Sequence, residues 1–164
     1  MAKVVIIVIV FIVIAVWWMF FRVARSAVPP LTIDENDPLM LEATQQAKSS
    51  LKQFLELYRQ RPQHASVKVP LTTSAGETEF LWAEVLGLEG KYVKVRLLTP
   101  PVSHPGKLER LHTYDLQYVV DWSVEMEGGK IHGGYTRRVM FKKGREQWGD
   151  LPDELKKEEQ KYLP

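Results

Sequence analysis

The chain contains no cysteine among its 164 residues. A disulfide, a thiolate nucleophile and a cysteine-ligated metal site are therefore excluded. Histidine is also scarce, and the four that occur show no spacing typical of metal ligands, such as i,i+4 with a carboxylate partner: His64, His104, His112 and His132. We expect no metal and no cofactor.

Strong charge of one sign is lacking as well. The formal net charge is +2, and without Lys3, Arg22 and Arg25 the 22 basic residues fall to 19 against 20 acidic ones. A general nucleic-acid-binding protein needs a basic face that releases counterions from phosphates, so no nucleic-acid partner is expected. A phosphate-binding loop, a dinucleotide-binding glycine pattern and a G-x-S-x-G nucleophile elbow are also missing from the sequence.

One long apolar run stands near the start of the chain. Val4 to Phe21 is eighteen residues without a charge, and at about 1.5 Å per residue such a helix approaches the ~30 Å of a bilayer core. The run is longer than the core of a signal peptide, and Arg22 and Arg25 follow it at once. We therefore predict a retained membrane anchor over residues 1–24 rather than a cleaved leader.

This anchor predicts that the chain crosses a membrane once, with the lipid bilayer as the partner of residues 4–21. The basic residues on the two sides differ too little for the positive-inside rule to fix the orientation, although their count leans towards a cytoplasmic domain. Residues 25–37 form a linker that Pro29-Pro30 stiffens, and residues 38–164 form the domain.

The domain begins with a helix. Asp37 suits the N-cap and Pro38 the first helical position, and apolar residues then recur at helical spacing until Pro62. We predict one long helix over residues 38–60 whose apolar face packs on a sheet.

The following segments alternate between apolar and polar residues in the manner of strands. Val67, Val69 and Leu71 predict a strand in which Pro70 favours an edge position. Further predicted elements are a hairpin over 79–99, a strand over 108–113 and a hairpin over 122–132 that turns at Gly128-Gly129. The predicted class is thus α+β, with one long helix on a mainly antiparallel sheet that follows a transmembrane helix.

The last third of the sequence contains two further features. Residues 136–143 fit either a short helix or a last strand, and a polar helix is predicted from Asp150 to about Tyr162. Gly133-Gly134 interrupts a strand-like stretch, which predicts a bulge, a bend or a close approach of another group to the backbone.

Three motifs carry a resemblance to a known family. They are Phe80-Leu81-Trp82-Ala83-Glu84-Val85, the pair Asp121-Trp122, and Gly-Gly-Tyr-Thr-Arg-Arg-Val at 133–139. Together they resemble the YegJ-like bacterial family of unknown function over about residues 37–141. The resemblance implies a compact α+β bacterial domain, and with the predicted anchor it implies a single-pass protein of the bacterial inner membrane. Because members of such families lie near secretion and interbacterial-toxin genes, it also suggests an immunity or accessory role, and it carries no catalytic residues.

The first candidate site is the group Asp121, His132 and Tyr135 around the second glycine pair. It would serve a small hydrolase or ligand-binding enzyme in which Asp121 acts as a general base. An aspartate before a tryptophan is also a structural pair, because the carboxylate accepts backbone N–H groups while the indole fills the core. We favour the structural interpretation.

The second candidate site is a basic run with five cations in nine residues, from Arg137 to Arg145, between Tyr135 and Trp148. It could bind an acidic protein surface or lipid headgroups, or it could be a solvated face balanced by the acidic C-terminal helix. The predicted binding residues are His132, Tyr135, Arg137, Arg138 and Trp148. We therefore expect a membrane-anchored accessory or immunity-like protein that binds a protein partner without catalysis, and the small enzyme is the alternative.

Overall fold

The computed structural model describes residues 31, 33–34, 36–73, 76–99 and 110–163. Its helices are α2 (Pro38–Ser49), α3 (Leu51–Gln60), α4 (Tyr135–Trp148) and α5 (Asp153–Glu159). Its strands are β1 (Ala65–Thr72), β2 (Thr78–Glu89), β3 (Tyr92–Leu97), β4 (Leu111–Asp115), β5 (Asp121–Glu125) and β6 (Ile131–Gly133). Short 3-10 turns occupy Pro62–His64, Leu116–Tyr118 and Glu127–Gly129.

The predicted membrane anchor lies outside the described residues. Among the residues that are described, no helix is long and apolar enough to cross a membrane.

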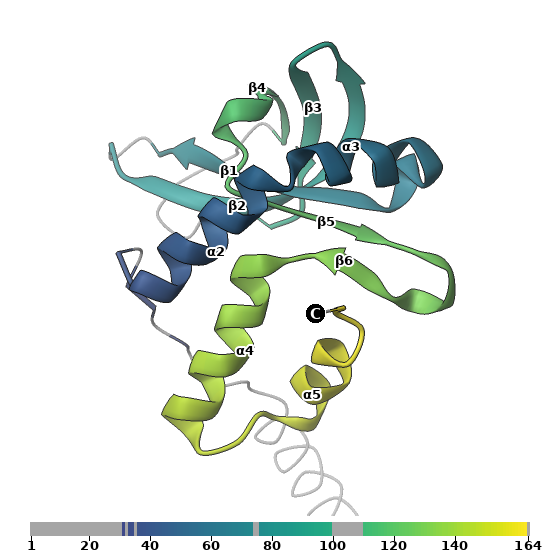
Figure 1. Ribbon diagram of the computed structural model, residues 1–164. Coiled ribbons are helices and arrows are strands. Elements are labelled where there is room, and N and C mark those ends of the chain that lie inside the picture. The colour runs from purple at the N-terminus through teal and green to yellow at the C-terminus, as the bar shows by residue number, and fades with distance from the viewer. Residues whose placement is uncertain (1–30, 32, 35, 74–75, 100–109, 164) are drawn as a thin grey trace, which may run out of the picture. The chain divides into compact units, whose positions relative to one another are not determined.

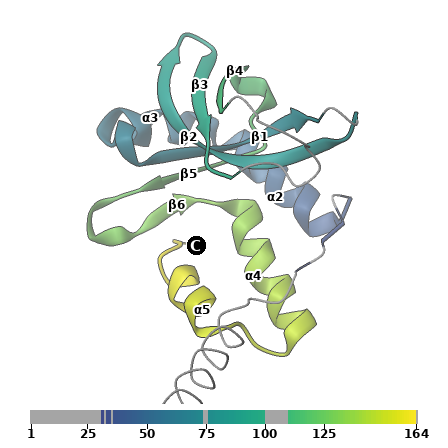
Figure 2. The same ribbon diagram turned by 180° about the vertical axis from the view of Figure 1, so that it is seen from behind.

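The six strands form one antiparallel sheet in the order β4-β3-β2-β1-β5-β6 (Figure 1). Helices α2 and α3 pack on one face of this sheet. Seen from behind, the strands lie in front of these two helices (Figure 2). Helix α4 leaves the end of β6 and runs beside α2, and α5 lies beside α4. The predicted α+β class with an antiparallel sheet is confirmed.

The core lies between the sheet and α2–α3. Val67 and Val69 of β1 are fully buried, as are Val93 and Val95 of β3, and Phe54 of α3 covers them. Burial alternates along β1 and β3, which confirms the predicted inward direction of their valines.

The predicted single helix over 38–60 is wrong in one respect, because α2 ends at Ser49 and α3 begins at Leu51. The predicted start is confirmed: Asp37 Oδ1 accepts the N–H of Leu39 at 2.9 Å, and Pro38 is the first helical residue. At the break, the hydroxyl of Ser50 donates to the carbonyls of Gln46 and Ala47 at 2.9 and 3.0 Å. A serine hydroxyl that bonds back to the preceding turn competes with the helical backbone.

The predicted edge position of Pro70 is also wrong, because β1 lies between β2 and β5. The pairing with β5 covers only Ala65 to Lys68. The carbonyl of Lys68 points towards the β5 side, where it accepts the N–H of Val120, so the position of Pro70 two residues later faces the same side. An N–H group at position 70 would therefore point to the β5 side, beyond the last residue of β1 that β5 pairs with. Proline can stand there because no strand partner is present among the described residues for its missing N–H.

Several boundaries differ from the prediction. The strand predicted over 108–113 is β4 at 111–115, and residues 108–109 lie outside the described part. The undecided segment 136–143 belongs to helix α4. The C-terminal helix is shorter than predicted, since α5 ends at Glu159. Both predicted hairpins are confirmed.

Candidate functional site

The carboxylate of Asp121 is fully buried at the start of α4. Oδ1 accepts the N–H groups of Trp122 at 2.8 Å and Tyr135 at 3.2 Å. Oδ2 accepts the N–H and the hydroxyl of Thr136, both at 2.7 Å. The first N–H groups of a helix have no partner within the helix, and Gly134 at the N-cap has no side chain to supply one. Asp121 therefore caps α4 from a neighbouring strand.

Burial raises the pKa of the Asp121 carboxyl above its ordinary value of 3.8, against the lowering effect of these four hydrogen bonds. All four donors belong to Trp122, Tyr135 and Thr136. Both oxygens are thus engaged within the fold, as the structural interpretation of Asp121 expects.

Trp122 points to the opposite face of the sheet and is also fully buried. Its indole Nε1–H donates to the carbonyl of Ala47 and to the hydroxyl of Ser50, both at 3.1 Å. Its ring lies 5.6 Å from that of Phe54 between centroids. This side chain joins β5 to the break between α2 and α3.

The second glycine pair allows two close approaches. A Cβ on Gly133, whose φ is +80°, would lie 2.2 Å from the carbonyl oxygen of Trp122. A Cβ on Gly134, whose φ is +64°, would lie 2.3 Å from the ring of Tyr162. The predicted close backbone approach at this pair is therefore confirmed.

Arg137, a predicted binding residue, is tied to the C-terminal helix. Its Nε and Nη2 donate to both carboxylate oxygens of Glu158 at 2.9–3.0 Å. Its guanidinium also lies over the ring of Phe141, 5.5 Å from the centroid. The partners of this arginine are thus inside the domain.

Arg138 and Tyr135, two further predicted binding residues, lie together. The Arg138 guanidinium is 4.7 Å from the centroid of the Tyr135 ring, and its Nη1 donates to the carbonyl of Leu163 at 3.0 Å. Both side chains line a groove of about 290 Å³ between α2 and α4, with Glu42 and Lys142 also on its walls.

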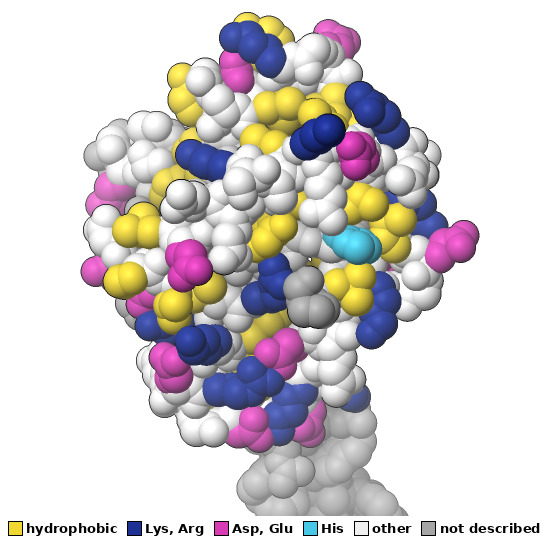
Figure 3. Space-filling view, viewed as in Figure 1, with side chains coloured by type: hydrophobic (Ala, Val, Ile, Leu, Met, Phe, Trp, Pro, Cys, Tyr) yellow, Lys and Arg dark blue, Asp and Glu magenta, His cyan; other side chains and the backbone are white. Residues whose placement is uncertain are grey.

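The rest of the basic run is largely paired. Lys143 Nζ lies 2.6 Å from Oδ2 of Asp37, and Arg145 pairs with Glu159 of α5. Lys143 lowers the pKa of Asp37, and Asp37 in turn raises the pKa of Lys143. In Figure 3 the basic and acidic side chains alternate on the visible face instead of separating by sign. The C-terminal helix thus supplies acidic partners for two cations of this run, Arg137 and Arg145.

The five predicted binding residues do not form one patch. His132 lies in β6, while Trp148 ends α4, on the far side of that helix from Tyr135. Neither His132 nor Asp121 lines the groove described above or the two hollows described below. Within the described residues, no group of three His, Asp or Glu side chains could hold a metal ion.

We name the face of the sheet opposite α2 and α3 the open face. Phe80 and Trp82 of β2 project from it and are only half-buried. Trp82 lies directly across from Lys68, so these side chains share this face. In the part of the chain that the structure describes, no helix packs over them (Figure 2).

One hollow of about 390 Å³ opens on this face beside α4. Trp82 and Leu98 from the sheet line it together with Arg137, Glu158 and Tyr162. Burial raises the pKa of Tyr162 to about 12, so its hydroxyl stays protonated at neutral pH. Polar hydroxyls complete the lining, from Ser66, Thr99 and Ser123.

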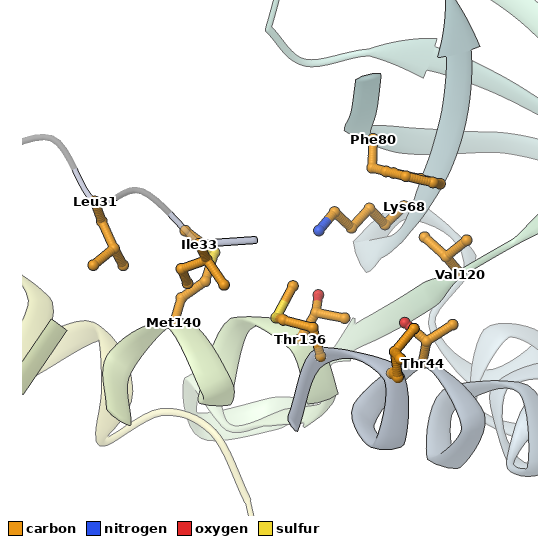
Figure 4. Close-up of a pocket in the computed structure, with 10 residues that line it drawn as sticks. Leu31, Ile33, Thr44, Lys68, Phe80, Val120, Thr136 and Met140 are labelled. Atoms are coloured by element: carbon orange, nitrogen blue, oxygen red, sulfur yellow. The ribbon is translucent and has the colours of Figure 1, made fainter. Parts of the chain in front are cut away.

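A second hollow of about 320 Å³ lies at the end of β1 that β5 does not pair with. Figure 4 shows the side chains of Lys68 and Phe80 directed towards it from the sheet, with Thr136 and Met140 opposite them on α4. Most of its lining is apolar. Met40, Leu41 and Thr44 of α2 also line it, so this hollow extends from the open face to α2. Lys68 and Trp82 are cross-strand neighbours, so the two hollows adjoin at these side chains.

The exposure of Phe80 and Trp82 was not predicted from the sequence. Their signal was present, because Phe80, Trp82 and Glu84 alternate with the inward residues of β2 and so point away from the core. Alternation could not indicate that α4 begins over β5 on this second face and leaves these two aromatic side chains half-buried.

Comparison with known proteins gives one family. A family model described as an uncharacterized protein conserved in bacteria (DUF2314) matches residues 37–150. The match covers all six strands and α2 to α4. A search of curated proteins found no match, and a search of solved structures found none.

Replacing Gly133 with alanine is expected to destabilise the domain by about 3 kcal/mol or more, because the new Cβ meets the Trp122 carbonyl in a strained backbone conformation. Gly128 is the matched control: its φ is +78° but nothing lies within 4 Å of an added Cβ. Gly128→Ala should cost only the conformational penalty of about 1–2 kcal/mol. Equal losses in urea denaturation would contradict the close approach.

Replacing Asp121 with asparagine removes a carboxyl group whose raised pKa makes the stability of the fold depend on pH. Between pH 3.8 and the raised folded-state pKa, the unfolded chain releases the proton while the folded chain keeps it. The contribution of Asp121 to the free energy of unfolding therefore falls as pH rises through that window. We expect the stability advantage of wild type over Asp121→Asn to be greatest below about pH 4 and to shrink at higher pH. Urea titrations across pH measure it, and an advantage that grows with pH would show that the hydrogen bonds outweigh burial.

Proposed function

The chain belongs to the family of uncharacterized proteins conserved in bacteria (DUF2314), and we propose that it is a non-catalytic module that binds another protein through the open face. Its more specific role is that of an accessory or immunity-like protein tethered to a bacterial membrane. We also propose that, within this family, the chain is a YegJ-like protein, because its three motifs resemble that group.

The observation that carries this proposal is that residues of two motifs, and the neighbour of the third, line one hollow of the open face. Trp82 belongs to the first motif, Arg137 to the third, and Ser123 directly follows the Asp121-Trp122 pair. A half-buried tryptophan and an arginine in a concave site are the residue types most enriched at the centres of protein interfaces.

The charges of the open face fit a protein better than a nucleic acid. Arg96 pairs with Glu84 across the strands at 2.6 Å, and Arg137 pairs with Glu158. A polyanion is bound by cations that face it without an acidic partner of their own. Paired charges around an apolar centre instead resemble the polar rim and apolar core of a protein interface.

The engagement of Asp121 supports binding over the alternative of a small enzyme. A general base needs a lone pair within reach of a substrate proton, whereas both oxygens of Asp121 accept hydrogen bonds from the fold. Tyr135 lines the α2–α4 groove, so the three residues of the alternative do not share one hollow.

Two of the five residues predicted from sequence belong to a second surface in this proposal, the α2–α4 groove. Tyr135 and Arg138 line the α2–α4 groove beside Lys142, which is exposed. Charge reversal at Arg137 or Arg138 would also break their bonds to Glu158 and Leu163. Lys142 therefore tests this groove without disturbing the C-terminal segment.

Photo-crosslinking in cells tests the open face. A benzoylphenylalanine at Trp82 or Leu98 is expected to form a covalent adduct with a protein partner, because both side chains line the hollow. The matched control is Lys52, which is exposed on α3 and faces away from the sheet. A probe at Lys142 reports on the groove, and adducts from Lys142 or Lys52 without any from Trp82 or Leu98 would remove the open face as the binding surface.

The tether is tested by removing residues 4–21. We expect the full chain to stay with the membrane pellet after a carbonate wash, since an apolar run of this length matches the bilayer core, and the deleted chain to move to the supernatant. The described domain should keep the same melting temperature in both. A full chain that the wash releases would contradict the anchor.

A further inference from the structure

The two edges of the six-stranded sheet differ in whether another described segment pairs with them. At the β6 edge, the N–H of Ile131 donates to the carbonyl of Lys161 at 2.8 Å, and the carbonyl of Ile131 accepts the N–H of Leu163 at 2.9 Å. Residues 161–163 thus occupy this edge as a short additional strand, with a parallel bridge between Ile131 and Tyr162. A covered edge cannot pair with another chain.

The β4 edge is not occupied in this way. The N–H of Leu97 bonds the carbonyl of Arg110, and the carbonyl of Lys91 accepts the N–H of Leu116. Backbone direction alternates along a strand, so the main-chain groups of Leu111 and Thr113 point away from β3. Among the described residues these outward groups have no hydrogen-bond partner.

This edge also lacks the usual protection. Natural edge strands carry lysine, proline, a bulge or inward charges that block pairing with another sheet. The sequence of β4 is Leu-His-Thr-Tyr-Asp, and its pairing with β3 runs from Tyr92–Asp115 to Arg96–Leu111 without a bulge. Its one charge, Asp115, is paired with Lys91 at 2.8 Å.

Two exposed apolar side chains belong to this edge. Leu111 lies in β4 and is 50% exposed, and Tyr118, which is 55% exposed, ends the 3-10 turn that follows β4. Apolar side chains exposed at an unpaired edge favour association with another surface.

We propose that β4 pairs with β4 of a second copy of this chain, antiparallel and about a two-fold axis at Thr113. In this register Thr113 exchanges both of its N–H···O bonds with Thr113 of the second copy. His112 then stands beside Tyr114 of the second copy, and Leu111 beside Asp115.

A second copy fits this edge because the register is self-complementary. The two Asp115 residues lie at opposite ends of the paired strands, so like charges do not oppose each other. Threonine opposite threonine is a favourable cross-strand pair. A two-fold axis lets one surface satisfy both copies, and the near-neutral charge of the domain adds little repulsion.

Single cysteines test the pairing directly, because the chain has none of its own. Opposed residues of a hydrogen-bonded antiparallel pair have Cα atoms about 5.5 Å apart, which a disulfide spans. In the full chain, in detergent micelles, we expect Thr113→Cys to oxidise to a covalent dimer at least tenfold faster than Thr72→Cys. Thr72 is an exposed threonine on another strand of the same sheet. Equal rates would overturn the proposal.

A second variant separates this edge from other interfaces. Leu111→Lys adds a charge to the edge at a half-exposed side chain, so the melting temperature should change little while dimerisation is lost. Light scattering of the micellar full chain, over a range of about 1 to 100 µM protein, measures the mass. A wild type that stays monomeric overturns the proposal, and so does a dimer that persists in Leu111→Lys, since it would form elsewhere. Neither result bears on the photo-crosslinks from the open face.

Discussion

The buried carboxylate of Asp121 is the group on which the arrangement of this domain depends. A helix that begins at a glycine has no cap of its own, and α4 receives its cap from β5, fourteen residues earlier in the chain. One side chain thereby couples the sheet to the second pair of helices. Because Trp122 follows it and points to the other face, the same strand also fixes the break between α2 and α3. Gly133 lets the returning chain lie against the Trp122 carbonyl, and Gly134 leaves room for the ring of Tyr162.

Local features of the fold could be predicted from the sequence, because their causes are local. The cap at Asp37, the inward valines of β1 and the turn at Gly128-Gly129 each follow from a few adjacent residues. The break at Ser50 could not be predicted, since its indole partner lies 72 residues away. Pro70 misled for a related reason, because only the sheet order reveals that β5 stops beside Lys68.

The candidate site shows the same division between near and distant causes. Sequence spacing indicated the basic run, but it could not say which acid each cation meets: Arg137 finds Glu158 and Arg145 finds Glu159 only through the fold. The resemblance pointed to the strand that carries Trp82 without indicating its exposed side. Whether His132, Tyr135, Arg137, Arg138 and Trp148 contact a partner stays a prediction.

The open face and the β4 edge use different groups, so two partners need not compete. A partner on the open face meets side chains that stand perpendicular to the sheet, whereas pairing at β4 uses main-chain groups in its plane. A partner that covers Arg137 also meets an arginine whose charge Glu158 already balances. Desolvating such a pair leaves no unpaired ion behind, which is the costly outcome at an interface. The charges of this face therefore permit contact with a largely apolar surface, and the edge permits two such faces to lie in one continuous sheet.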